Sequence, residues 1–437
     1  MKRVLIITYY WPPSGGAGVQ RWLKFVKYLR EYGWEPVVYT PLNPEIPTYD
    51  ESLLADIPPE TEIIRSPIFE PYQFYKLLTG KKKDAKFQHG FLKDGISGNS
   101  SVAEKLSVWI RGNLFIPDAR AFWVRPSVKF LSAYLSNKPV DLIVSTGPPH
   151  SLHLIAKSLK KKTRLPWLAD FRDPWTGIYY FDKLQLSGPA KRKHFRLEQA
   201  CLDEADHLVT VGETMKKDFE ARTTTPISVV TNGFDHTDFP LSEPVKSEFF
   251  TIFYSGMFLP DQNPPELWEA LAELTMENQA FSKALQLRFV GKCDAGILAD
   301  IERNKLGNHL QLEDYVPHNR LPALQQSASI LLLSINRIEN ASYILTGKVF
   351  EYMAAGRPIL ALCPEESDVA GIIRDSRSGY TIGFGKKDEL KSLLTQLFER
   401  FKNGSLKTEK QETAAFTRQA LTAEMTQIFD RLTRKSI

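Results

Sequence analysis

The feature that most constrains the fold is an alternation of short apolar strands and helical segments, which starts twice along the chain. Near the N-terminus, residues 4–10 (VLIITYY) have the composition of a buried strand, and apolar residues at helical spacing follow over 19–29. The pattern begins again at 250–256 (FTIFYSG), with a second apolar run at 285–291. Such alternation predicts an α/β protein with a doubly wound parallel sheet in each half.

A chain of 437 residues is long enough for two such domains, each with its own core. Residues 240–249 contain two prolines and several charges, as linkers do. We therefore predict an acceptor-side domain over 1–242, a donor domain over 243–412, and a terminal segment over 413–437 that returns to the first domain.

The composition favours a globular protein of a reducing compartment. The charged fraction is 24% and the net charge is +5, which argues against wholesale disorder and demonstrates no particular partner. The three cysteines are far apart and form no C-x-x-C motif, so we expect neither a disulfide framework nor a metal site. No apolar run reaches the roughly 18 residues of a membrane span. The opening run is too short for a signal peptide, and a cytoplasmic protein is expected.

Residues 346–362 (TGKVFEYMAAGRPILAL) predict a helix followed by a strand, with Thr346 as N-cap and Gly356 just past the helix end. A helix that opens with Thr346, Gly347 and Lys348 offers free N–H groups, a positive dipole end and an ammonium, which suit a phosphate. Glu351, one turn further on, has the two oxygens needed to accept hydrogen bonds from a ribose diol. The alternative is an ordinary amphipathic helix with a surface Lys–Glu pair.

Glycines follow several of the predicted strands. The loop WPPSGGAG after the first strand contains Gly15, Gly16 and Gly18, while Gly256 and Gly291 end two strands of the second half. Glycine lets the backbone approach a diphosphate or an acceptor closely, so we assign these five positions to ligand binding. The loop is not GxGxxG, which argues against a dinucleotide-dependent dehydrogenase, and a purely structural turn is an equal alternative.

Charged residues and a histidine stand at two further strand ends of the first half. His150 follows the strand at 140–145, and Asp170, Arg172 and Asp173 end the strand before Pro174. Because ligands bind at the carboxyl ends of parallel strands, these four residues are our acceptor-side and catalytic candidates. The alternative is a structural ion network around Arg172.

The segment FEYMAAGRPILA resembles the donor-site helix of GT-B glycosyltransferases of the group 1, or family 4, retaining type. The STGPPHS and ADFRDPW segments, around His150 and Asp170, resemble bacterial transferases of exopolysaccharide and O-antigen synthesis. In this family a glutamate at the position of Glu351 holds the ribose of a sugar nucleotide, and the first-domain histidine contributes to the active centre. A second family glutamate is expected at position 343, where this chain has Tyr343.

The resemblance implies the GT-B fold, with two Rossmann-like doubly wound domains facing a cleft. It also implies transfer of a hexosyl or N-acetylhexosaminyl group from a nucleotide-diphosphate sugar to a hydroxyl of a saccharide or lipid-linked acceptor. Anomeric configuration is retained, no metal or other cofactor is required, and a role in cell-surface polysaccharide synthesis follows.

Two other functions stay open. A sugar-nucleotide epimerase uses the same cleft but needs acid and base groups on both faces of the sugar. A non-catalytic scaffold with a decayed donor pocket would explain Tyr343 and the absence of a basic pair from 255–264. Intact Lys348 and Glu351 argue against the scaffold.

Basic residues are concentrated over 81–93, and aromatic residues alternate with arginines over 108–131. We expect the basic region 81–93 to contact the anionic inner face of the cytoplasmic membrane, although solvated charges and core helices explain the two patterns equally. No nucleic-acid partner is expected.

Overall fold

The computed structural model describes residues 1–46, 48–70, 109–110, 112–239, 248–317, 320–406 and 412–434. It divides into two compact units, one of residues 1–231 with 418–437 and the other of residues 232–417. The sequence analysis placed its boundaries at 242/243 and 412/413. The basic region 81–93, to which that analysis assigned membrane contact, lies outside the described residues.

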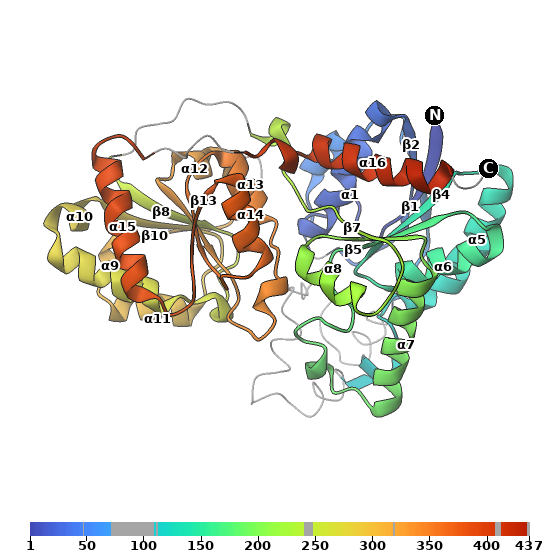
Figure 1. Ribbon diagram of the computed structural model, residues 1–437, viewed down its shortest axis with the longest axis horizontal. Coiled ribbons are helices and arrows are strands. Elements are labelled where there is room, and N and C mark those ends of the chain that lie inside the picture. Colours follow the sequence, from blue (N-terminus) through green and yellow to red (C-terminus); the bar gives the residue numbers. More distant parts are fainter. Residues whose placement is uncertain are drawn as a thin grey trace. The chain divides into compact units, whose positions relative to one another are not determined.

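The first unit is built on a seven-stranded parallel sheet with helices between its strands (Figure 1). Its strands are β1 (Lys2–Ile7), β2 (Trp34–Pro41), β3 (Glu62–Ser66), β4 (Leu142–Gly147), β5 (Trp167–Phe171), β6 (His207–Thr210) and β7 (Ile227–Val229). Its α-helices are α1 (Ala17–Leu29), α5 (Val124–Asn137), α6 (Ser151–Thr163), α7 (Gly188–Glu204), α8 (Glu213–Glu220) and α16 (Arg418–Arg434).

The strand order of this sheet is β3-β2-β1-β4-β5-β6-β7. Strand β1 pairs on one side with β2 and on the other with β4, all in parallel. The chain therefore turns to opposite sides after β1, and the loops that follow β1 and β4 leave the sheet next to each other. In open α/β sheets this reversal point is where ligands bind.

The last helix, α16, packs on the first unit. Leu421, Met425 and Phe429 join the buried apolar cluster formed by α1 and one face of the sheet. The rings of Trp34 and Phe429 meet edge to face at 5.2 Å. The C-terminal helix thus contributes to the core of the first unit, which otherwise consists of N-terminal residues.

The second unit is built on a six-stranded parallel sheet. Its strands are β8 (Phe250–Ser255), β9 (Leu285–Val290), β10 (Leu310–Glu313), β11 (Ile330–Ser334), β12 (Ile359–Leu362) and β13 (Gly379–Ile382). Its α-helices are α9 (Pro265–Glu277), α10 (Gln279–Ala284), α11 (Ala295–Arg303), α12 (Leu321–Ser327), α13 (Lys348–Ala355), α14 (Asp368–Ser376) and α15 (Lys387–Lys402).

The strand order here is β10-β9-β8-β11-β12-β13, which repeats the pattern of the first six strands of the other sheet. Alternate residues of β11 face opposite sides: Leu332 belongs to the core under α9 and α15, and Leu331 and Leu333 belong to the core under α13 and α14. Both faces of the sheet are covered, which explains the uninterrupted apolar strand sequence ILLLS. The predicted pair of doubly wound parallel sheets is confirmed.

Element boundaries differ from the predictions by a few residues. Strand β1 ends at Ile7 rather than Tyr10, and Gly347 rather than Thr346 occupies the N-cap position of α13. The predicted helix stop is correct, since Gly356 has the left-handed backbone, with φ of 68°, that favours glycine at this position. No described helix combines the length and the apolar character needed to cross a membrane.

Candidate functional site

Arg172 joins three loops at the reversal point of the first sheet. Its guanidinium donates to the carbonyl of Gly18, in the segment after β1, at 3.0 Å, and to the carbonyl of Pro148, in the loop after β4. Its backbone N–H donates to the carbonyl of Gly147 at 2.9 Å. The cation is therefore engaged by backbone carbonyls, and it fixes the loops after β1, β4 and β5 relative to one another.

The three glycines of the first loop have different environments. Gly16 precedes α1 with φ of 94°, a conformation that favours glycine. The N–H of Gly15 donates to the carbonyl of Thr48 at 2.8 Å. A Cβ atom on Gly18 would lie 3.1 Å from the Arg172 guanidinium, so this glycine permits the close approach of Arg172.

Asp170 is completely buried at the end of β5 and accepts hydrogen bonds from side chains of two elements. Arg21 of α1 donates from Nη2 at 2.8 Å, Trp22 of α1 donates from Nε1 at 2.7 Å, and Thr146 of β4 donates at 2.8 Å. The Arg21 charge and these hydrogen bonds hold the pKa of the Asp170 carboxyl below its usual value. Asp170 thus holds α1 against the sheet, and its ion-pair partner is Arg21 of α1 rather than the adjacent Arg172 of the predicted ion network.

His150 lies directly after the Pro148–Pro149 loop and precedes α6. Its ring stacks on Trp175 at 4.9 Å with an interplanar angle of 6°. Burial, together with the neighbouring His153 and Arg172, lowers the pKa of His150 well below its usual value, so the ring is neutral at pH 7. Asp173, the last catalytic candidate, follows Arg172 on the loop after β5, and its side chain is exposed.

In the second unit, the loops that follow β8 and β9 pack against each other at the reversal point between β8 and β11. Gly256 follows β8, Gly291 follows β9, and both have positive φ, at 100° and 114°. A Cβ atom on Gly291 would lie 2.6 Å from the carbonyl oxygen of Gly256. These positions therefore require glycine for the two loops to pack together.

Lys348, the first residue of α13, contacts the Gly256 loop. Its Nζ donates to the hydroxyl of Tyr254 at 2.7 Å and lies 4.1 Å from the centre of the same ring. Burial lowers the pKa of the Lys348 ammonium to about 8, an effect that Glu351 opposes. A Cβ atom on Gly256 would lie 3.2 Å from Nζ, so glycine leaves room for the lysine.

The start of α13 provides polar groups beside this ammonium. Thr346 does not occupy the N-cap, but its hydroxyl accepts from the N–H of Lys348 at 3.3 Å. Gly347 has no neighbouring atom within 4 Å of a Cβ position, so the helix N-terminus is open there. Glu351 lies in the first helical turn, close enough to Lys348 to influence its pKa.

Tyr343, which occupies the position of the expected first glutamate, belongs to the short 3₁₀ helix η9 (Ala341–Tyr343) before α13. Another basic candidate of this unit, Arg337, is already paired with Glu266 and packs on the ring of Phe384 at 4.6 Å. Lys348 therefore remains the best-placed cation at this reversal point.

The predicted site residues thus lie in two separate groups, one in each unit. His150, Arg172 and Gly18 meet in the first unit; Gly256, Gly291 and Lys348 meet in the second. Sequence reasoning missed Arg21 and Tyr254. Arg21 gives only a weak signal in the sequence, because it is one of several basic residues among the apolar residues of this helix.

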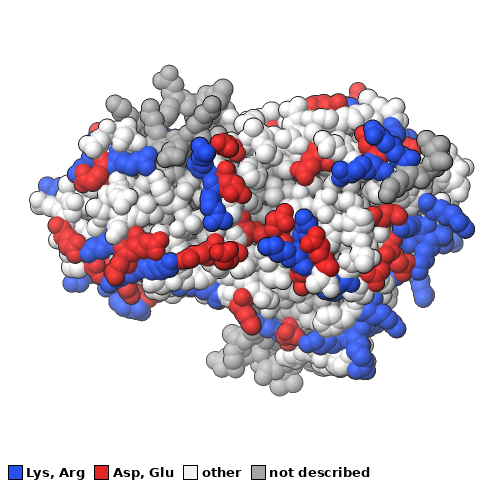
Figure 2. All heavy atoms as spheres, viewed as in Figure 1, with Lys and Arg blue, Asp and Glu red and all other residues white. Residues whose placement is uncertain are grey.

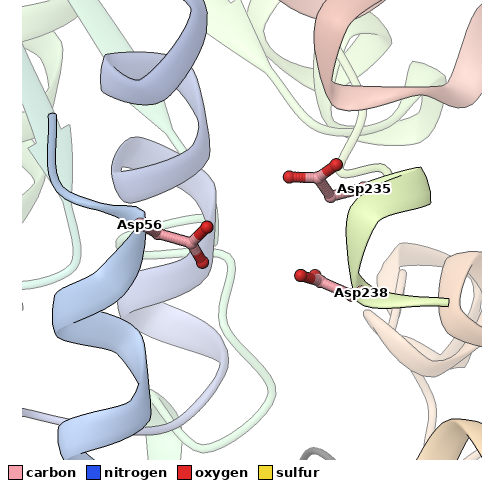
Figure 3. A group of neighbouring side chains, drawn as sticks. All are labelled: Asp56, Asp235 and Asp238. Carbon is pink, nitrogen blue, oxygen red and sulfur yellow. The ribbon is translucent and has the colours of Figure 1, made fainter. Parts of the chain in front are cut away.

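Figure 3 labels three acidic residues that we examined as metal ligands, Asp56, Asp235 and Asp238. Asp235 caps the 3₁₀ helix η5 (His236–Asp238) by accepting from the N–H of Thr237 at 3.0 Å. Asp56 belongs to the other unit and pairs with Lys24 at 2.8 Å and with Lys27 at 2.9 Å. Within the part of the chain that the structure describes, we assign no metal site to them.

Comparison with known families and structures defines the class of this fold. Residues 250–400, which lie within the second unit, match the family model described as Glycosyl transferases group 1. The chain as a whole has the GT-B fold of glycosyltransferase structures. No curated protein sequence matches the chain.

Three solved structures illustrate the likeness. Sucrose-phosphate synthase from Thermosynechococcus elongatus has a TM-score of 0.65 and 14% identity, with all of both chains covered. Anabaena Alr3699/HepE, determined with UDP-glucose, has a TM-score of 0.54 and 13% identity, covering 100% of this chain and 99% of its own. WaaG, a glycosyltransferase of lipopolysaccharide biosynthesis, has a TM-score of 0.51 and 15% identity, covering 99% and 98%. At these identities the likeness establishes the fold alone.

Proposed function

We propose that this protein transfers a sugar from a nucleotide-diphosphate sugar to a hydroxyl of a saccharide or lipid-linked acceptor, with retention of anomeric configuration. The observation that carries the proposal is the reversal point of the second sheet. There the Lys348 ammonium, an open helix N-terminus and two glycine loops come together within the residues that match the glycosyl transferase family.

Each part of this arrangement suits a leaving diphosphate. Negative charge develops on the diphosphate as its bond to the sugar breaks, and fixed donors stabilise that charge in the transition state. The positive dipole end of α13 and the ammonium of Lys348 provide such stabilisation, and Gly256 leaves space beside the ammonium. Glu351 then accepts from the ribose hydroxyls. Because the positive charge at this site comes from Lys348 and the helix dipole, the proposal requires no metal.

The first unit is assigned the acceptor side. His150 meets the transferring sugar or the acceptor hydroxyl, Asp173 is exposed on the loop after β5, and Arg172 binds the backbone of Gly18 and Pro148 nearby. In a retaining front-face reaction the leaving phosphate oxygen takes the acceptor's proton, so the protein need not supply a base. Asp170 acts through α1 and contacts no ligand.

The test is a transfer assay on the full chain with a panel of nucleotide sugars and saccharide acceptors, in buffer containing EDTA. We expect one sugar nucleotide to yield a glycoside whose anomeric configuration, read by NMR, matches that of the donor. Glu351→Ala should abolish most turnover, and Glu339→Ala, an exposed acid before the donor helix, is the matched control. Inversion, or activity that returns only with a divalent metal, would contradict the proposed mechanism.

The same assay separates the two alternatives. If the protein is a scaffold with a decayed donor pocket, the wild type and Glu351→Ala would bind a partner equally well, and neither would release a nucleotide from a sugar nucleotide. A sugar-nucleotide epimerase would convert the donor sugar in the absence of any acceptor. The acid–base candidates of the first unit are His150, which is buried and neutral at pH 7, and the exposed Asp173, and no described contact pairs them as the acid and base that an epimerase needs.

A lipid-linked acceptor would bring the protein to a membrane, and a surface of the first unit supports this part of the proposal. Helix α7 exposes Lys191, Arg192, Lys193 and Arg196, and Phe195 between them is 42% exposed. Figure 2 shows Lys and Arg side chains gathered over α7. Basic residues around an exposed ring suit an anionic lipid surface. Co-sedimentation with vesicles containing anionic lipid, compared with neutral vesicles, tests this contact, and equal binding to both would contradict it.

A further inference from the structure

His153, three residues after His150 and in the first turn of α6, was not among the predicted site residues. Its side chain is completely buried, and its ring stacks on Phe171 at 4.3 Å and lies 5.8 Å from that of His150. Burial lowers the pKa of His153 to about 3, so the ring is neutral at pH 7. A neutral imidazole has one N–H donor and one acceptor, and its neighbours decide which nitrogen carries the proton.

The neighbours of His153 Nδ1 settle this choice. The indole Nε1 of Trp167, which can only donate, donates to the Ser145 hydroxyl oxygen at 2.8 Å. The same oxygen lies 2.8 Å from His153 Nδ1, and Ser145 is completely buried. Among the described residues, His153 Nδ1 is the acceptor that remains for the serine proton. Nδ1 therefore accepts, and the ring proton of His153 is on Nε2.

That N–H points towards His150. His153 Nε2 and His150 Nδ1 are both buried and have no hydrogen-bond partner among the described side chains and backbone. A Cβ atom on Gly147 would lie 2.5 Å from the first and 3.0 Å from the second, so the two nitrogens face one small space beside this glycine. A buried donor without a partner is costly, and a water molecule held between the two nitrogens satisfies both.

We propose that His153 is a positioning residue that fixes the tautomer of His150. Trp167, Ser145, His153 and the bridging water form one chain of hydrogen bonds, at the end of which His150 Nδ1 accepts. The His150 proton is then on Nε2, the nitrogen left to meet a ligand. His150 is thereby a hydrogen-bond donor to a hydroxyl of the transferred sugar or of the acceptor and is not the base that deprotonates the acceptor. The identity of the ligand of His150 rests on the proposed function, whereas the assignment of the His150 tautomer does not.

The experiment is nitrogen NMR of the full chain labelled with ¹⁵N-histidine, without substrate, with His150→Gln and His153→Gln used for assignment. We expect a protonated-type shift for Nε2 and an unprotonated-type shift for Nδ1 in both rings. A proton on His150 Nδ1, or averaged shifts that indicate exchange between tautomers, would overturn the proposal. Because no ligand is added, this result is independent of whether the protein is a transferase.

Variants then test the chain of hydrogen bonds. Ser145→Ala removes the donor to His153 and should convert the His150 shifts to averaged values, whereas Ser158→Ala, on the outer part of α6, should not. His153→Gln keeps an N–H near the position of Nε2 and should preserve the His150 tautomer, which His153→Leu should lose. If His153→Leu leaves the His150 shifts unchanged, His153 has no positioning role. In the transfer assay we expect Ser145→Ala to lower kcat about tenfold with little change in KM.

Discussion

The two units of this protein use the same strand order and place their candidate groups at the same topological point, but the chemistry there differs. In the first unit the cation, Arg172, is engaged by the carbonyls of Gly18 and Pro148, and the neighbouring histidine is neutral. In the second, Lys348 lies on an aromatic ring beside an open helix N-terminus. We therefore propose that the fold determines where ligands bind in each unit, and that the partners of each charged side chain determine which unit binds an anion.

The largest effect is expected from breaking the buried ion pair between Asp170 and Arg21 in the first unit. Asp170→Asn leaves Arg21 buried without its counter-charge, which should lower the free energy of unfolding by about 3–5 kcal/mol. The exposed pair Lys191–Asp182 is the control, since Asp182→Asn should cost no more than about 1 kcal/mol. Denaturant unfolding measures both. An Asp170→Asn protein of normal stability that has lost transfer activity would show that Asp170 is catalytic instead.

The second-largest effect is expected from removal of the Lys348 ammonium in the second unit. Lys348→Met removes a charged hydrogen-bond donor worth about 1.5–3 kcal/mol, so nucleoside diphosphate should bind roughly 10–150 times more weakly by calorimetry. The matched control is Lys402→Met on α15, because Lys402 also lies over a ring, that of Phe398, at 5.3 Å. Equal affinity in both variants would remove Lys348 from the site.

The pH dependence of binding should distinguish the two units. The Lys348 ammonium has a pKa of about 8, and a diphosphate binds the protonated form. Raising the pH from 7 to 9 deprotonates the free protein's lysine, so affinity should fall about tenfold over this range. In Lys348→Met the affinity should be flat over the same range. A fall of equal size in the variant would assign the titration to another group.

The smallest effect concerns the residue that holds Lys348. Tyr254→Phe keeps the ring under the ammonium but removes the hydroxyl that accepts from Nζ. Loss of one hydrogen bond of about 1 kcal/mol should weaken diphosphate binding about fivefold. Tyr380→Phe, which removes a hydroxyl bonded to Arg400 elsewhere in the same unit, should leave binding unchanged. An equal loss of diphosphate affinity in both variants would indicate that removing a tyrosine hydroxyl disturbs the second unit as a whole.

Local sequence was sufficient for much of the second unit. The helix stop at Gly356 and the strand that follows are encoded in a few adjacent residues. The contiguous segment from Thr346 to Glu351 could be placed at a helix N-terminus from local signals, although the N-cap is Gly347 rather than Thr346. The two doubly wound sheets followed from hydrophobic periodicity because both faces of each sheet are covered.

The first unit could be predicted less completely because its site is assembled from distant segments. Asp170 seemed catalytic because a charge at a strand end is costly to bury, but its partner Arg21 comes from a helix 149 residues earlier. The contact of Arg172 with Gly18 spans 154 residues. Tyr254 looked like an ordinary strand residue, and only the packing of α13 against the Gly256 loop brings Lys348 to its hydroxyl. Such partners are determined by tertiary structure, which a single sequence does not display.

The most direct test of the central claim is a calorimetric titration of the full chain, in EDTA, with the nucleotide selected from a thermal-shift panel of UDP, GDP, ADP, dTDP and CMP. Wild type is compared with Glu351→Ala in the second unit and with His150→Ala in the first. We predict that Glu351→Ala weakens binding by at least about tenfold and that His150→Ala changes it by no more than about twofold. Loss of nucleotide binding in His150→Ala with retention in Glu351→Ala would contradict the assignment of the donor site to the second unit.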